Sequence, residues 1–480
     1  MAPADTANLD QLRDTLNRHG QAHLLTFADS LAPAELDSLV EQIRAIDFDK
    51  LPALIRDYVK SKPEFELPTG VEPAPYYPAD PSTPESSYDA AKYKAAGEDL
   101  LRAGKIACFT VAGGQGSRLG YDGPKGCFPA GAVSKKPLFQ IFAEGVLATG
   151  RKYGSTVPWY IMTSPLNHEA TVAFFNEHSH FGLNPADVMF FPQGTMPSFD
   201  MDSATILLAD RHTIATNPDG HGGSLTALQA SGALDDMVGR GIEHISYFQV
   251  DNATISVADP LFLGIHATAP DSSGEMSSKM LPKAYAEEKV GLFATAGGRT
   301  HVIEYSDMPM DLQREILPDG RLRFGAGSPA IHAFGVEFVK KVTTDDAFDL
   351  PYHRAEKKVA HVDLETGEPV TPESPNAVKL ERFVFDALPL AERSIVLETS
   401  RVEEFAPIKN AEGIDSPQSS AELQTQRAAN WLEAYGVEIP KKPDGTPDCV
   451  LEISPLTALE PGDLAGKDLP KIEAGGEAVL

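Results

Sequence analysis

A glycine-rich turn directly after a short apolar run constrains the fold of this chain more than any other feature. Residues 106–111 read IACFTV and predict a buried strand, and AGGQGSRLG follows at residues 112–120. Four glycines within eight residues leave the backbone N–H groups accessible, so the turn can wrap around phosphate oxygens. Arg118 and Lys125 add two cations to the same loop. The segment therefore predicts a strand that ends in a nucleotide-phosphate loop.

Two familiar glycine motifs fit this loop less well. A P-loop requires Gly-x-x-x-x-Gly-Lys-Ser/Thr, a spacing that does not occur here. Gly114, Gly116 and Gly120 are spaced one residue too widely for the dinucleotide fingerprint. The next predicted strand also ends in Ser164 and Pro165, without the acidic residue that binds a ribose. A dehydrogenase is therefore disfavoured, and a glycine turn that binds no ligand is the remaining alternative.

Charge and cysteine content exclude several classes of partner. The 480 residues include 69 Asp and Glu against 41 Lys and Arg, a formal net charge of -28. Such a field repels nucleic acids and anionic membranes, so a phosphorylated substrate needs a local basic pocket. The three cysteines are too few and too widely spaced for a disulfide framework or a zinc site. Without a signal sequence or an apolar run of membrane-spanning length, we expect a cytoplasmic protein.

Strand-like and helical segments alternate between about residues 105 and 385. This pattern predicts an α/β fold with a Rossmann-like, mostly parallel mixed sheet that is covered on both faces. The predicted strands are 106–111, 158–163, 187–191, 245–250, 290–294, 302–305 and 449–453, and the clearest predicted helices are 167–178 and 420–435. We expect an N-terminal helical region with a proline-rich wrap (1–100), a catalytic domain (101–404) and a small C-terminal α+β domain (405–480).

Other candidate site residues follow strands or glycines. Asp251 comes directly after the apolar run 245–250, where a carboxylate can hold Mg²⁺ or cap a turn. The phosphate loop at the same edge of the sheet favours the metal role. His221 lies in the glycine cluster 218–223, which is either a binding loop or a tight turn with an exposed histidine. Lys379 and Lys409 lie in patterned segments, and composition alone assigns neither a role.

Taken together, these segments resemble the eukaryotic-type UDP-N-acetylhexosamine pyrophosphorylases, within the UDP-sugar pyrophosphorylase superfamily. The resemblance covers roughly residues 100–410 and is carried by 112–120 with 124–126, 193–194, 218–223, 250–252 with 258–260, 304–306, 379–386 and 405–410. It implies a nucleotidyltransferase fold of the GT-A-like type. It also implies an enzyme that uses UTP, a sugar 1-phosphate and Mg²⁺ to make a UDP-sugar and pyrophosphate, as a monomer or weak homo-oligomer.

The resemblance also implies roles for individual residues. The catalytic cations would be Arg118, Lys125 and Lys409. The nucleotide would be bound by Val111, Ala112, Gly113, Gly114, Gln193, Gly220, Asp251 and Lys379, with Asp251 holding Mg²⁺. The sugar would be bound by His221, Gly291, Glu304, Tyr305 and Ser328.

Two positions depart from the family pattern, both on the sugar side. His221 replaces the asparagine of an Asn-Gly-Gly cluster, and related glucose-using enzymes carry histidine there. Ser328 stands where the hexosamine enzymes usually have asparagine. We expect N-acetylglucosamine 1-phosphate as the acceptor, with glucose 1-phosphate or a broad acceptor range as the alternative. A non-catalytic nucleotide-sugar sensor is disfavoured because the charged set is retained, and an NADP-linked oxidoreductase because the ribose acid is absent.

Overall fold

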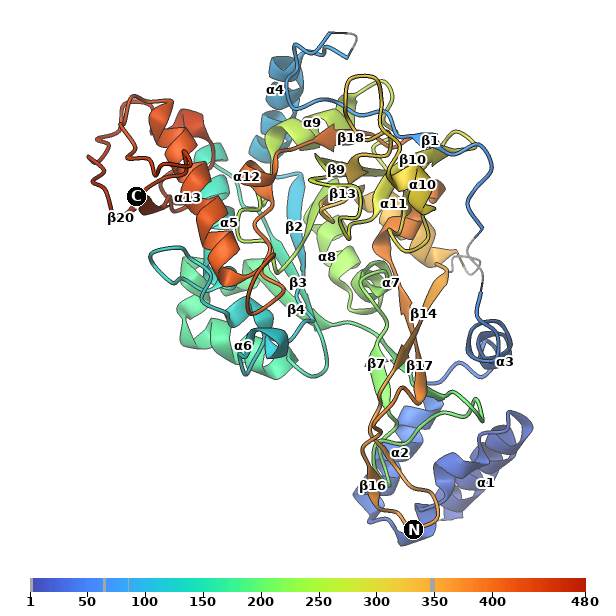
Figure 1. Ribbon diagram of the computed structural model, residues 1–480. Coiled ribbons are helices and arrows are strands. Elements are labelled where there is room, and N and C mark those ends of the chain that lie inside the picture. Colours follow the sequence, from blue (N-terminus) through green and yellow to red (C-terminus); the bar gives the residue numbers. More distant parts are fainter. Residues whose placement is uncertain (1–2, 64–65, 85, 346–349) are drawn as a thin grey trace. The chain divides into compact units, whose positions relative to one another are not determined.

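The computed structural model describes residues 3–63, 66–84, 86–345 and 350–480. The chain forms two compact units, each assembled from separate stretches (Figure 1). Unit 1 comprises Met1–Glu66, Gly194–Gly223 and Leu350–Phe383; unit 2 comprises Leu67–Gln193, Ser224–Asp349 and Val384–Leu480. The predicted division into domains after residues 100 and 404 stays a prediction.

Unit 2 contains a large mixed sheet. Within the described residues it has 11 strands in the order β1-β10-β12-β9-β13-β8-β2-β3-β4, with β11 beside β10 and β18 beside β9. The neighbours β8, β2, β3 and β4 are parallel, and β9 and β18 are parallel as well. The bounds are β1 Glu72–Pro73, β2 Ile106–Val111, β3 Trp159–Thr163, β4 Val188–Pro192, β8 His244–Gln249, β9 Met276–Pro282, β10 Leu292–Ala296, β11 Arg299–Ile303, β12 Ala326–Gly327, β13 His332–Gly335 and β18 Val396–Glu398. The predicted α/β fold is confirmed.

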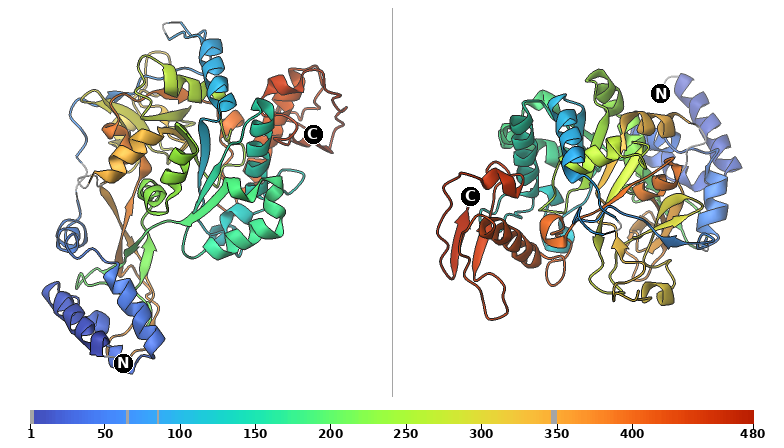
Figure 2. Two further views of the ribbon diagram at one scale, coloured as in Figure 1. Left: turned by 180° about the vertical axis from the view of Figure 1, so that it is seen from behind. Right: turned by 90° about the horizontal axis from the view of Figure 1, so that it is seen from above.

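Helices cover both faces of this sheet (Figure 2). On one face Ile106 and Cys108 of β2 join a core with α4 (Ala90–Arg102), α5 (Leu138–Tyr153), α6 (His168–Glu177) and α9 (Pro260–Thr268). On the other face Tyr160 of β3 donates a hydrogen bond of 2.6 Å to Asp236 of α8 (Ala233–Gly239). Successive residues of a strand point to opposite faces, so an apolar run such as 106–111 is buried on both sides. The remaining α-helices described in unit 2 before residue 400 are α7 (Gly223–Ala230), whose first residue belongs to unit 1, α10 (Met310–Gln313) and α11 (Val336–Thr344).

A pair of glycines allows α4 and α9 to cross at close range. A Cβ on Gly264 would overlap the carbonyl oxygen of Tyr93, and one on Gly97 would overlap that of Pro260. Gly264→Ala is therefore expected to lower the free energy of unfolding by about 1–3 kcal/mol, because the overlap forces the helices apart. Gly462→Ala is the control, since a Cβ there meets nothing within 4 Å. Equal urea midpoints for the two variants would contradict this close crossing.

The last part of unit 2 has a small core of its own. It contains α12 (Arg401–Glu404), α13 (Pro417–Glu433) and a parallel pair, β19 (Cys449–Glu452) and β20 (Gly476–Val479). Helix α13 begins three residues earlier than predicted, because Ser416 caps it by accepting a hydrogen bond from the backbone N–H of Ser419. The side chain of Ser420 is buried and donates to the carbonyl of Ala406. α13 is thereby attached to the segment before Lys409.

Unit 1 joins the N-terminal helices to strands from later in the chain. Its helices α1 (Pro3–Arg18), α2 (Pro33–Arg44) and α3 (Leu51–Leu54) share a core with β17, through residues such as Leu16, Leu39 and Leu380. Its strands pair as β14-β17-β6, β15-β16 and β5-β7. Their bounds are β5 Thr195–Pro197, β6 Phe199–Asp200, β7 Thr216–Pro218, β14 Tyr352–Lys357, β15 His361–Val362, β16 Pro369–Val370 and β17 Ala377–Arg382. The predicted N-terminal helices are present, but their partners lie hundreds of residues away.

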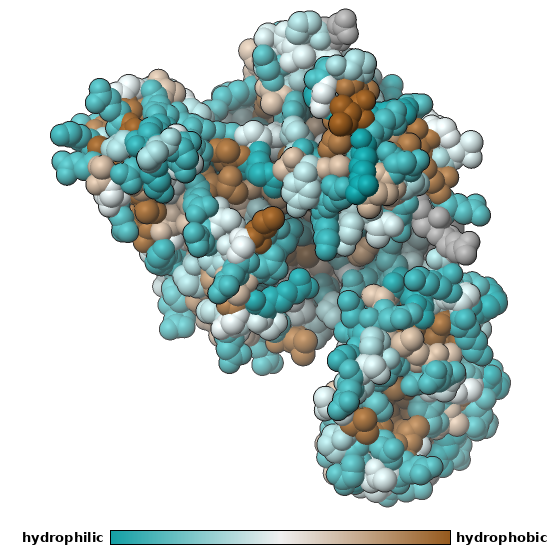
Figure 3. Space-filling model, in the orientation of Figure 1, coloured by the Kyte–Doolittle hydropathy of each residue, from teal (hydrophilic) through white to brown (hydrophobic). Residues whose placement is uncertain are grey.

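The surface is predominantly hydrophilic on the face drawn in Figure 3, where hydrophobic residues are scattered among polar ones. Among the helices of the described residues, none has both the length and the apolar character needed to cross a membrane. The three cysteines are unpaired.

Candidate functional site

The glycine loop after β2 is held firmly in place. The backbone N–H of Ala112 donates to the carbonyl of Met162 (2.7 Å), and Lys125 N–H donates to the carbonyl of Gly114 (3.0 Å). The buried amide of Asn167 donates to the carbonyls of Ala112 and Gly114, at 3.0 and 3.2 Å. The sequence predicted Asn167 only as the start of a helix, so its side-chain role was missed. The loop is therefore a preorganised structure with its carbonyls turned toward the protein.

Three consecutive backbone donors of this loop have no partner in the described part of the chain. They belong to Gly113, Gly114 and Gln115, whereas the N–H groups of Ala112 and Gly116 are occupied. Consecutive free N–H groups form a concavity that binds anions such as phosphate. This is the arrangement that the glycine spacing predicted.

Gln193 lies directly against the glycine loop. Its backbone N–H donates to the carbonyl of Thr163 (2.8 Å), which fixes it beyond the end of β3. A Cβ on Gly113 would lie 2.9 Å from Oε1 of Gln193, so a side chain at position 113 would displace the end of Gln193. Two predicted nucleotide-binding residues are thus brought together, although 80 positions separate them in the sequence.

Lys125 and Asp251 face each other at the carboxyl ends of the parallel strands. Lys125 Nζ lies 3.7 Å from Asp251 Oδ2, and their side chains are 17% and 13% exposed. Asp251 follows β8, which pairs with β2 up to Val111, so both loops lie at one edge of the sheet. Arg118 is exposed and forms no ion pair within the described residues. Its charge is available to a ligand at this edge.

Lys409 lies near the same edge of the sheet because the preceding residue, Ile408, is hydrogen-bonded to Asp251. Ile408 N–H donates to the carbonyl of Asp251 (2.8 Å), and Lys409 N–H donates to the carbonyl of Asp415 (2.6 Å). Burial raises the pKa of Asp415 above its ordinary value, while the nearby charges of Lys409 and Arg401 oppose that rise. Asp415 has a left-handed backbone (φ 58°), and no sequence motif singled it out. The backbone of residues 408–409 thus lies beside Asp251, and Lys409 Nζ lies 5.6 Å from the centroid of the Phe405 ring.

The residues at this edge fit Mg²⁺ bound largely by substrate. Among the described residues, no three His, Cys, Asp or Glu side chains gather into a metal-binding group. Mg²⁺ commonly takes one or two carboxylates and completes its shell with phosphates and water. Asp251 has the carboxylate chemistry and the partial exposure for that role, and the free N–H groups nearby suit the phosphates.

The predicted sugar-binding residues of unit 2 also cluster. Ser328 N–H donates to the carbonyl of Gly291 (2.8 Å), and a Cβ on Gly291 would lie 3.4 Å from Oε1 of Glu304. Tyr305 follows Glu304 in the sequence, and its side chain is 37% exposed. Ala330 has a left-handed backbone (φ 58°), and its N–H contacts Ser328 Oγ at 3.4 Å.

Strand register places this cluster near the end of β8. β9 pairs first with β13 and then with β12, so these two form one interrupted strand. β13 also pairs with β8, with His332 opposite Tyr247. The interruption at residues 328–331 therefore lies beside the carboxyl end of β8, which leads to Asp251.

Three predicted site residues belong to unit 1 instead. Lys379 lies in β17, and Gly220 has φ +83° against the backbone of Arg382, where a side chain would collide. His221 stacks on Phe383 with ring centroids 5.1 Å apart and an interplanar angle of 11°. Burial, with a smaller contribution from His353, lowers the pKa of His221 to about 4. Near pH 7 His221 is therefore neutral, and toward a ligand it can offer hydrogen bonds but no charge.

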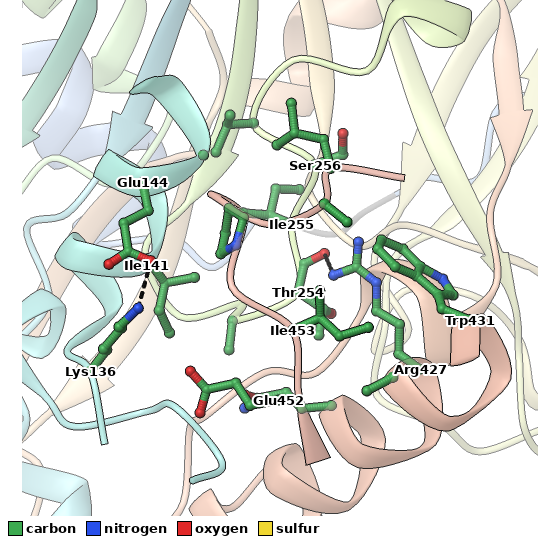
Figure 4. Close-up of a pocket in the computed structure, with 18 residues that line it drawn as sticks. Lys136, Ile141, Glu144, Thr254, Ile255, Ser256, Arg427, Trp431, Glu452 and Ile453 are labelled. Atoms are coloured by element: carbon green, nitrogen blue, oxygen red, sulfur yellow. Dashed lines mark hydrogen bonds and ion pairs between the residues drawn. The ribbon is translucent and has the colours of Figure 1, made fainter. Parts of the chain in front are cut away.

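A cavity of about 70 Å³ lies elsewhere in unit 2 (Figure 4). It is bounded by the loop 253–257, by Glu144 of α5, by Arg427 and Trp431 of α13 and by residues 452–459. None of the predicted site residues lines it. The cavity is thus separate from the phosphate loop, although Ala253, which lines it, follows Asp251 by only two residues.

Comparisons with known proteins identify relatives of this chain. A family model described as UTP--glucose-1-phosphate uridylyltransferase matches residues 79–427. The chain is 35% identical to the UDP-N-acetylglucosamine diphosphorylase 2 of Arabidopsis thaliana, covering 97% of this chain and 91% of that protein. It is 36% identical to the UDP-N-acetylglucosamine pyrophosphorylase of Saccharomyces cerevisiae, covering 87% and 90%. A crystal structure of the Trypanosoma brucei uridine diphosphate N-acetylglucosamine pyrophosphorylase superposes with a TM-score of 0.77 at 26% identity, covering 97% and 94%.

Proposed function

Because the chain belongs to the UTP--glucose-1-phosphate uridylyltransferase family, we propose that it transfers the uridylyl group of UTP to N-acetylglucosamine 1-phosphate and releases pyrophosphate. The observation that carries this proposal is the single sheet edge shared by three free N–H groups, Lys125, Asp251 and the Lys409 loop. That edge combines anion donors, two lysines and one carboxylate, the groups that a triphosphate and its metal require.

The proposed reaction needs no general base. A phosphate oxygen of the sugar 1-phosphate is already anionic and forms the new bond to the α-phosphorus of UTP. The bond from that phosphorus to the oxygen that bridges the α- and β-phosphates of UTP breaks, and pyrophosphate leaves with the electron pair of that bond. Catalysis therefore consists of aligning the three groups and countering their crowded negative charge.

Each residue is assigned a role according to its position at this edge of the sheet. The N–H groups of residues 113–115 hold phosphate oxygens, and Gln193 beside them contacts the base. Arg118 and Lys125 bind the departing pyrophosphate, and Lys409 neutralises phosphate charge at the reacting centre. The role of Lys379, which lies in unit 1, stays a prediction. Asp251 would hold Mg²⁺, which would supply further neutralisation of phosphate charge. A cytoplasmic location and a monomeric or weakly associated state stay predictions.

Glucose 1-phosphate is the second candidate acceptor, and Ser328 is the observation that favours it. The serine side chain is shorter than the asparagine expected at this position, and the adjacent Ala330 is held in a left-handed conformation. A pocket that lacks an amide discriminates less strongly for a substrate amide. The sugar side can therefore accept a wider range of hexoses than the hexosamine pattern implies.

An assay of pyrophosphate release with UTP and Mg²⁺ tests the proposal and ranks the acceptors. We expect kcat/KM to be highest for N-acetylglucosamine 1-phosphate when glucose, N-acetylglucosamine and N-acetylgalactosamine 1-phosphates are compared. An equal or higher value for glucose 1-phosphate would establish the second candidate. Binding of UTP without pyrophosphate release for any acceptor would identify a nucleotide-sugar sensor.

A further inference from the structure

A buried lysine outside the proposed site connects three elements of unit 2. Lys279 lies in β9 and is 2% exposed. Its Nζ donates to Asp259 Oδ2 (2.6 Å) and to both carboxylate oxygens of Glu404 (2.8 and 2.6 Å). Although burial disfavours its charge, Asp259 and Glu404 hold the pKa of Lys279 above its ordinary value. Because an ammonium has three donors, these bonds use its full capacity.

Glu404, which binds Lys279, is also hydrogen-bonded to the loop after β8. Asn252 Nδ2 donates to the carbonyl of Glu404 (2.7 Å), and Asn252 Oδ1 accepts from the backbone N–H of Ala406 (2.9 Å). Ser256 N–H donates to Glu404 Oε1 (3.3 Å). Together with the hydrogen bond from Ile408 N–H to the carbonyl of Asp251, these contacts join residues 251–256 to residues 404–408.

Hydrogen bonds as well as apolar packing hold the loop 253–257, because this loop borders a cavity. Thr254, Ile255 and Ser256 line the cavity of about 70 Å³ together with Trp431 and Arg427, and Arg427 Nη1 donates to the carbonyl of Thr254 (3.2 Å) (Figure 4). A loop with empty space on one side has few contacts there to resist displacement. Ala253, Ile255 and Val257 pack in the core of unit 2, and the hydrogen bonds from Asn252 and Ser256 to Glu404, which Lys279 holds, add a polar constraint on the same loop.

We propose that Lys279 is a positioning residue for uridylyl transfer, which sets the placement of Asp251 relative to Lys409. This inference rests on the roles of those two residues in the proposed function. Lys279 reaches neither of them directly: it acts through Glu404 and Asn252. Asp259 completes the network by fixing Lys279 to the start of α9, where its other oxygen accepts from Leu261 N–H (2.9 Å).

The first test is the kinetics of Lys279→Met, which removes the ammonium group but keeps an unbranched side chain up to the Cε position. We expect kcat to fall by about 10- to 100-fold, with KM for UTP changed by less than about threefold, because alignment is lost and the phosphate loop is intact. Lys341→Met is the control, since Lys341 is 70% exposed and forms only a 3.5 Å ion pair with Glu275. Glu404→Gln serves as the milder variant if Lys279→Met does not fold.

A double mutant separates positioning from general destabilisation. If Lys279 acts through Lys409, Lys279→Met should lower kcat little further in a Lys409→Ala background. Fully multiplicative losses, or a Lys279→Met enzyme with wild-type kcat, would overturn the inference.

Hydrogen exchange gives a readout that does not depend on activity. In Lys279→Met the amides of residues 251–257 and 404–409 should exchange faster, while those of residues 112–125 should not. Unchanged exchange in the first two segments would also overturn the inference. If the wild-type protein released no pyrophosphate but these segments still exchanged faster, the proposed function would fail while the structural link from Lys279 stood.

Discussion

Asp251→Asn is expected to lower the rate of pyrophosphate release at least about a hundredfold at saturating UTP and acceptor. The asparagine preserves the shape of the side chain but removes the negative charge beside Lys125, whose Nζ lies 3.7 Å away. A neutral amide is a much weaker Mg²⁺ ligand than a carboxylate, so under the proposed role of Asp251 the variant would lose charge neutralisation at the phosphates. A hundredfold corresponds to about 2.7 kcal/mol in the transition state.

Stability measurements distinguish this loss from misfolding. The carboxylate of Asp251 makes one long ion pair, so we expect the free energy of unfolding to change by less than about 1 kcal/mol. Asp319→Asn removes a surface carboxylate paired with Arg321 and should leave turnover unchanged. Near-normal turnover of Asp251→Asn over a range of Mg²⁺ concentrations would exclude Asp251 from the mechanism.

Local pattern was sufficient to predict the strands that carry the site. The run 106–111 is β2 as predicted, and the run 245–250 is β8 displaced by one residue. Both strands are buried on two faces, so their apolar residues are consecutive and easy to recognise. The placement of Asp251 beside the glycine loop then followed from the rule that parallel strands end at one edge.

Long-range pairing was not predictable in the same way. Residues 194–223 and 350–383 alternate like the rest of the chain, yet they form the strands of unit 1 with the N-terminal helices. Their strands are as short as two residues, and their partners are set by tertiary packing that leaves no periodic signal.

Individual supporting residues were also invisible in the sequence. Lys279 is followed and preceded by ordinary strand residues, and a lysine is usually a solvated charge. Asn167 looked like a helix cap, yet its amide donates to two carbonyls of the phosphate loop. Such roles depend on what lies opposite the side chain in space, which sequence spacing does not encode.

Lys409→Ala is expected to cause a loss of similar size, at least about a hundredfold in kcat, by removing a cation from the reacting phosphates. The fold should persist, because the loop is held by backbone bonds from Ile408 to Asp251 and from Lys409 to Asp415, which alanine retains. Lys442→Ala, at an exposed position near the C-terminus, is the matched control.

Chemical rescue tests whether the missing charge itself is responsible for this loss. A small alkylammonium ion can enter the space left in Lys409→Ala and restore part of the positive charge, so the rate of pyrophosphate release should rise with its concentration. Asp251→Asn should show no such rise, because it lacks an anion and not a cation. Lys409→Arg should recover only part of the activity, since the planar guanidinium is bulkier and does not reproduce a compact ammonium. If Lys409→Ala turned over at the wild-type rate without added amine, charge neutralisation by this lysine would be excluded, and Lys125 and Arg118 would remain as the cations at this edge of the sheet.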